Sequence, residues 1–142
     1  HANLLPWRRH AVTHLPTPRS ASGLADVVAD ALEHWRGRPP LLAITGASNV
    51  TGEVLPLDDL VEIVQRVGGR VVLDAAQLAP HRPIDLAASG VDYVAFSGHK
   101  LYAPFGAGVL VGRADWLDSG APYLAGGGAV HAVTVRDVAW QR

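Results

Sequence analysis

The strongest constraint on the fold is an alternation of short apolar runs with segments that have helical periodicity. One helical segment has its apolar residues at the spacing i, i+3, i+4 and i+7, and Ser22 is placed to act as its N-cap. This apolar stripe consists of Leu24, Val27, Val28, Ala31, Leu32 and Trp35. A second stripe consists of Leu57, Leu60, Val61 and Val64. Asp58 and Asp59 fall in the first turn of the second helix, where the helix dipole favours anions, and Gly68 and Gly69 end it.

Apolar runs between and after these segments have the length of strands, and they predict β-structure at residues 41–45, 71–73, 92–96 and 107–111. The first run is continuous, which is typical of a strand buried on both faces. A short helical segment is expected at 85–88. Strands that alternate with helices in this way predict an α/β domain with a mostly parallel sheet and flanking helices.

Composition and charge exclude several classes of partner. The 142 residues are 49% hydrophobic, which is sufficient for a globular core. Twelve basic residues stand against thirteen acidic residues, so the chain lacks the overall charge typical of proteins that bind nucleic acids or membrane surfaces. We therefore expect a small-molecule partner, no nucleic acid and no membrane.

The sequence also narrows the location and the available chemistry. No apolar run approaches the roughly 20 residues that a membrane helix needs, and the opening HANLLPWRRH lacks the order of regions found in a signal peptide. The absence of cysteine excludes a disulfide, a thiolate zinc site and a cysteine nucleophile within these residues. We expect surface or core roles for the histidines, and no metal site is predicted. A cytoplasmic protein fits these observations.

Polar clusters follow three of the predicted strands, at residues 45–52, 74–77 and 97–100. Because the carboxyl ends of parallel strands meet at one edge of a sheet, where the ligands of α/β domains gather, we expect these clusters to form one site. The candidate site residues are Asn49, Asp74, Gln77, Ser97, His99 and Lys100.

Lys100, within FSGHKLYAPFG, is the only lysine in the chain, and every other strong base is an arginine. An arginine stays protonated in proteins, whereas a lysine can lose its proton when it is desolvated or lies near another cation. The neutral amine can then attack a carbonyl carbon and form a Schiff base. Lys100 is therefore the candidate nucleophile.

Asp74, within VVLDAAQ, is a carboxylate at the end of an apolar strand, where it requires a partner. It suits a cationic heterocycle such as the protonated pyridine ring of pyridoxal phosphate, with Gln77 donating to the ring phenolate oxygen. Ser97 and His99 lie close enough to Lys100 to contact the cofactor phosphate. The alternative for Asp74 is a helix cap or an arginine partner, and for Ser97 and His99 it is a turn or surface role.

These residues stand in the stretch VVLDAAQLAPHRPIDLAASGVDYVAFSGHKLYAPFGAGVLVG, which closely resembles the cofactor-binding core of class V aminotransferases. The resemblance is to the cysteine desulfurase and selenocysteine lyase branch, and it implies a pyridoxal-phosphate enzyme of fold type I. It implies that Asp74 contacts the pyridine nitrogen, that Gln77 contacts the phenolate oxygen and that Lys100 forms the Schiff base. It also places Ser97 and His99 at the phosphate.

The resemblance covers essentially the whole chain. The segment SNVTG implies that Asn49 lies beside the cofactor or the substrate. Residues 1–142 are expected to be the central part of the cofactor-binding large domain, incomplete at both ends. The family's phosphate loop, ring-stacking histidine, carboxylate-binding arginine and active cysteine would then lie outside them. The resemblance further implies an amino-acid substrate and a homodimer, with desulfuration, elimination, transamination and racemisation all open as reactions.

Two alternative functions compete with this interpretation. ITGASNVTGE follows an apolar strand, as does the glycine-rich turn of an NAD(P)-binding short-chain dehydrogenase. That match is incomplete, because Val50 replaces the middle glycine and Tyr93 lies too far from Lys100 to form the Tyr-x-x-x-Lys pair. The second alternative is a chain that binds a cofactor without catalysing a reaction.

Overall fold

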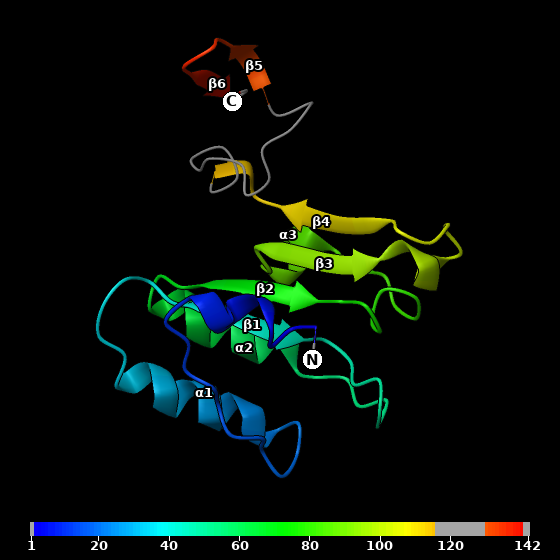
Figure 1. Ribbon diagram of the computed structural model, residues 1–142. Coiled ribbons are helices and arrows are strands. Elements are labelled where there is room, and N and C mark those ends of the chain that lie inside the picture. Colours follow the sequence, from blue (N-terminus) through cyan, green and yellow to red (C-terminus); the bar gives the residue numbers. More distant parts are fainter. Residues whose placement is uncertain (1, 116–129, 141–142) are drawn as a thin grey trace. The chain divides into compact units, whose positions relative to one another are not determined.

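The computed structural model describes residues 2–115 and 130–140. The chain forms two compact units, His1–Gly112 and Arg113–Arg142. The elements of the first unit are η1 (Pro6–Arg9), α1 (Gly23–Glu33), β1 (Leu41–Thr45), α2 (Leu57–Arg66), β2 (Arg70–Asp74), α3 (Leu86–Ser89), β3 (Tyr93–Ser97), η2 (Gly98–Leu101) and β4 (Gly108–Gly112) (Figure 1). Within the described ranges, no helix is long and apolar enough to cross a membrane.

The first unit is built on a four-stranded sheet in the order β1-β2-β3-β4. β1 pairs with β2 and β2 pairs with β3 in parallel, whereas β4 returns antiparallel to β3. Figure 1 shows the first three arrows pointing the same way, with α1 and α2 beside the sheet. The prediction of an α/β fold with a mostly parallel sheet and flanking helices is therefore confirmed.

One face of the sheet packs against the helices. Leu73 and Val71 of β2 are fully buried in a single cluster with Ile44 of β1 and Val94 of β3. The helices contribute Leu24 and Val28 from α1, and Leu60, Val61 and Val64 from α2. Because side chains alternate along a strand, Asp74 starts from the opposite face, away from these helices.

The structure corrects the expectation that the first strand is buried on both faces. Of β1 only Ile44 is buried, and Leu41 is 38% exposed. The reason is topological, because β1 is an edge strand of this sheet and the helices of the first unit pack against one face.

Two details of the first helix also differ from the prediction. Ser22 is the N-cap residue of α1, but its side chain makes no capping bond, and Ser20 Oγ accepts from the Gly23 amide at 3.3 Å instead. The helix ends at Glu33, so Trp35 is outside the helical stripe. Its indole nitrogen donates to the Arg38 carbonyl at 2.8 Å, which ties Trp35 to the following loop.

The second unit contains an antiparallel pair that the sequence did not predict. β5 (Val130–Val133) pairs with β6 (Val138–Trp140). In the connecting turn, Thr134 Oγ1 accepts from the amides of Arg136 and Asp137 at 3.3 and 2.9 Å. A side-chain contact in the turn supports this pairing. The residues of the two strands carry no strong periodic pattern from which the pairing could have been predicted.

We expect Val64→Ala to lower the free energy of unfolding by about 2 to 3 kcal/mol, because it removes two buried methyl groups and leaves a cavity. Val64 is fully buried on α2, whereas Val50 is 85% exposed, so Val50→Ala is the matched control. Urea unfolding followed by circular dichroism measures both variants. Equal stability of the two variants would contradict the assigned core.

Candidate active site

Three neighbouring strands end at one edge of the sheet. Thr45, Asp74 and Ser97 are the last residues of β1, β2 and β3. Thr45 is the register partner of Asp74, and Asp74 is the partner of Ala95. Register partners share a face of a sheet, so these side chains start in one row at its carboxyl edge. The parallel pairing of β1, β2 and β3 therefore brings their carboxyl ends to one edge of the sheet, as predicted.

Asp74 is partly buried and is held by the loop that follows it. Its Oδ1 accepts from the Ala76 amide at 3.0 Å, and its carbonyl accepts from the Gly46 amide at 2.9 Å. Among the described residues, no arginine pairs with the carboxylate, and no donor reaches Oδ2. Asp74 therefore makes a local turn contact and keeps one oxygen available for a ligand. Gln77 lies in the same turn and is partly buried.

Lys100 lies in η2, the turn that directly follows β3. The turn is closed against the start of β4, because the Gly98 amide donates to the Ala107 carbonyl at 2.7 Å. Lys100 is partly buried, and no carboxylate pairs with it in the described part of the chain. The amine is thus placed at the carboxyl edge without a charged protein partner.

Ser97 and His99 lie on either side of Gly98. Ser97 is partly buried and pairs in register with Gly108 of β4. His99 is exposed, and its ring stacks on Phe105 with centroids 5.7 Å apart and 19° between the planes. The stacking holds the imidazole against the loop after η2.

Asn49 lies in the loop between β1 and α2 and is exposed. Ser48 shapes this loop, since its Oγ accepts from the amides of Val50 and Thr51 at 3.2 and 3.1 Å. An antiparallel bridge between Ala47 and Val54 closes the loop. The structure therefore places Asn49 at the tip of a structured loop that follows the carboxyl end of β1.

The same loop removes the structural basis for the dehydrogenase alternative. In a dinucleotide fold the glycine-rich turn opens a helix whose amides hold the pyrophosphate. Here the segment Gly46–Gly52 runs into the bridged loop, and α2 begins only at Leu57. The glycines from Gly106 to Gly112 lead into and form β4, as predicted.

The six candidate residues form a set of ligands without mutual bonds. No hydrogen bond or ion pair joins any two of these side chains within the described residues. The set offers a carboxylate, an amine, an imidazole, a hydroxyl and two carboxamides from the ends of adjacent strands. A carboxylate on one strand and an amine after the next suit pyridoxal phosphate, which has a basic ring nitrogen and an aldehyde.

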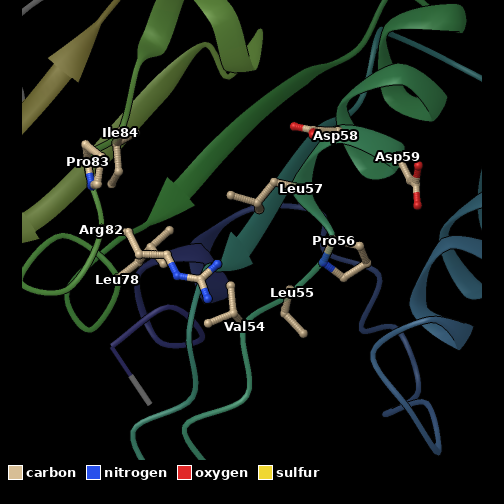
Figure 2. Close-up of a pocket in the computed structure, with 10 residues that line it drawn as sticks. All are labelled: Val54, Leu55, Pro56, Leu57, Asp58, Asp59, Leu78, Arg82, Pro83 and Ile84. Atoms are coloured by element: carbon tan, nitrogen blue, oxygen red, sulfur yellow. The ribbon is translucent and has the colours of Figure 1, made fainter.

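A cleft of about 360 Å³ lies elsewhere in the first unit and contains none of the six residues. It is lined by residues 54–59 together with Leu78, Arg82, Pro83 and Ile84. Figure 2 shows the Arg82 guanidinium in this cleft beside Val54, while Asp59 lies on the far side of Pro56. The lining is mostly apolar. It contains no lysine, and its two carboxylates, Asp58 and Asp59, lie on α2 and not at the end of a strand. The candidate site therefore rests on the strand ends.

Three further side chains at this edge were not among the candidate residues, although Thr45 belongs to the predicted polar cluster 45–52. Asn3 Nδ2 donates to Thr45 Oγ1 at 3.4 Å, and Trp7 Nε1 donates to Asn3 Oδ1 at 3.2 Å. Thr45 was detectable as a polar residue ending an apolar strand, in line with Asp74. Asn3 had no such signal, because 42 sequence positions separate it from Thr45.

Comparison with known proteins identifies the family of this chain. The sequence profile of the class-V aminotransferase family matches residues 1–142. The chain therefore belongs to the class-V aminotransferase family.

The curated relatives include proteins named as cysteine desulfurases. The chain is 40% identical to the probable cysteine desulfurase 2 of Mycobacterium leprae, with 99% of the chain and 34% of that protein covered. It is 38% identical to the cysteine desulfurase of Klebsiella pneumoniae, with 100% of the chain and 36% of that protein covered. The chain thus spans about a third of the length of these relatives.

Solved structures support the fold assignment. The crystal structure of the cysteine desulfurase CsdA from Escherichia coli matches with a TM-score of 0.87 and 37% identity over 99% of this chain and 36% of that one. The cysteine desulfurase from Thermococcus onnurineus matches with a TM-score of 0.79 and 27% identity, at the same coverage. The predicted resemblance to the cysteine desulfurase branch and its fold is confirmed.

We expect Gly98→Ala to displace the turn that carries Lys100. A Cβ at Gly98 would lie 2.9 Å from the Ala107 Cβ and 3.1 Å from the Ala107 carbonyl oxygen, so the turn or β4 must move. Gly108→Ala is the matched control, because a Cβ there meets nothing within 4 Å. Peptide mapping after treatment with an amine-reactive reagent measures the labelling rate of Lys100. An unchanged rate in Gly98→Ala would contradict this account of the turn.

Proposed function

We propose that the protein containing these residues is a pyridoxal-phosphate-dependent enzyme that acts on an amino acid. The observation that carries the proposal is the placement of Lys100 directly after β3 and of Asp74 at the end of its parallel neighbour β2. Membership of the class-V aminotransferase family supports it. The names of the relatives favour cysteine as the substrate and desulfuration as the reaction.

In this proposal the residues at the carboxyl edge of the sheet have different roles. Lys100 would hold the cofactor through its amine, and the same amine would be placed to move a proton at the substrate Cα. Asp74 holds a proton on the ring nitrogen, and Gln77 donates to the ring oxygen. When bound, pyridoxal phosphate supplies an electron sink for the amino acid.

The remaining three residues bind and orient the cofactor or the substrate. Ser97 and His99 contact the cofactor phosphate, and the contact of His99 with Phe105 restricts the imidazole ring. Asn49 lies beside the cofactor or the substrate, on the loop that Ser48 shapes. Residues 1–142 contain no cysteine, so a thiolate that accepts sulfur must come from outside them. Transfer of sulfur to a protein thiolate therefore requires more than these residues.

We extend the proposal to assembly and location. The resemblance to cysteine desulfurases supports a homodimer and a place in the cytoplasm. An amino acid is then the small-molecule partner. Sedimentation of the full-length protein tests the dimer independently of catalysis.

Borohydride reduction of the full-length protein loaded with pyridoxal phosphate should fix the cofactor on Lys100, because reduction makes the bond to the amine permanent. Peptide mass mapping locates the adduct. Lys100→Arg is the control, since it retains the positive charge and loses the nucleophilic amine, and we expect no adduct. An adduct on another residue, or none on a protein that binds the cofactor, would sink the assignment of Lys100.

Asp74→Asn should retain cofactor but lower kcat by roughly 100-fold or more, because a neutral amide no longer holds the charge on the ring nitrogen. The assay is sulfide release from cysteine by the full-length protein. Asp30→Asn, at an exposed position of α1, is the matched control and should leave kcat unchanged. Turnover by Asp74→Asn near the wild-type rate would contradict the role of Asp74. A cofactor-loaded wild type that turns over no amino acid would favour the non-catalytic alternative.

A further inference from the structure

The amino-terminal segment meets the sheet at the edge that carries the candidate site. The Asn3 carboxamide bonds to the Thr45 hydroxyl at 3.4 Å and to the Trp7 indole at 3.2 Å. All three side chains are partly buried. A connected series of polar contacts therefore runs from η1 to the last residue of β1.

The indole of Trp7 determines which way the hydrogen bonds of this series run. An indole N–H only donates, so the carboxamide oxygen of Asn3 faces Trp7 and its nitrogen faces Thr45. The Thr45 oxygen accepts this bond, which leaves the hydroxyl hydrogen to donate elsewhere. No side chain or backbone group in the described ranges accepts it. Thr45 is thus a donor with one bond still to make.

The sheet register places an acceptor beside this donor. Thr45 and Asp74 are register partners and lie on the face away from α1 and α2. Asp74 Oδ1 already accepts from the Ala76 amide, and Oδ2 has no donor among the described residues. A free donor and a free acceptor therefore stand on adjacent strands.

We propose that Asn3 and Thr45 are positioning residues of the active site. Asn3 orients the Thr45 hydroxyl, which donates to the Asp74 carboxylate in the loaded enzyme and fixes the angle at which that carboxylate meets the ring nitrogen. The inference rests on the proposed function, because it assigns Asp74 to the cofactor ring. It adds two residues that do not themselves touch the cofactor.

Two variants of the full-length protein test the proposal. Thr45→Val removes the hydroxyl and retains the shape, while Asn3→Ala removes the group that orients it. The 3.4 Å contact is longer than the usual range of about 2.7–3.2 Å, so we expect each variant to weaken the affinity for pyridoxal phosphate by only about 3-fold. Absorbance titration of the apo-protein measures the affinity. The visible circular dichroism of the bound cofactor should decrease as well, because its orientation is less fixed.

A double variant and a rescue variant distinguish a positioning role from a general effect on the stability of the protein. The double variant should lose no more affinity than the weaker-binding single variant, because both residues act through one series of bonds. Thr45→Ser retains the hydroxyl and should restore the affinity and the dichroism. Thr17→Val, the same substitution at an exposed position, should leave both unchanged.

Four outcomes would overturn the proposal. Additive losses in the double variant would show that the residues act separately. A lower unfolding temperature with unchanged affinity and dichroism would show a purely structural role. A wild-type protein that binds no pyridoxal phosphate would overturn the proposed function as well, whereas a binding wild type with unaffected variants would overturn this inference alone.

Discussion

The site depends on the parallel register of β1, β2 and β3. This pairing sets Thr45 beside Asp74 and Asp74 beside Ala95. A shift of one residue in β2 would turn Leu73 toward the polar face and Asp74 into the helix-packed core. Burial of Leu73 opposes that shift, because the side chain is fully enclosed by the cluster of α1 and α2. The hydrophobic packing of Leu73 on one face therefore determines which polar side chains, among them Thr45 and Asp74, lie on the opposite face at the carboxyl edge.

The return strand β4 completes this arrangement at the lysine. In the connection between β3 and β4, which includes η2, the backbone at Gly98 approaches Ala107 closely, and a side chain at Gly98 would prevent this approach. The antiparallel pair then holds Ser97 opposite Gly108. Backbone hydrogen bonds thus position the backbone of the turn that carries Lys100, whose amine has no charged partner among the described residues.

The sequence predicted what local patterns encode. Helical periodicity located α1 and α2, and apolar runs located β1 to β4, because burial on one face repeats at a fixed interval. Lys100 and Asp74 were found from their chemistry and from strand ends. The exposure of Leu41, the exit of Trp35 from α1 and the bond from Asn3 to Thr45 were not predictable, because each depends on a contact or an edge set by tertiary structure.

The face of the sheet that carries Asp74 is covered differently from the face that carries Leu73. On the side of Leu73, α1 and α2 contribute buried residues to the core cluster and Leu86 of α3 packs against it, whereas the row from Thr45 to Ala95 starts on the other side. A lysine becomes a nucleophile at neutral pH only when water is excluded or a neighbouring cation acts on it. Lys100 is only partly buried by the described residues. In the proposed enzyme, the exclusion of water from this edge would therefore come from the cofactor or from protein outside the described residues, and the amino-terminal segment held by Asn3 already lies beside this edge.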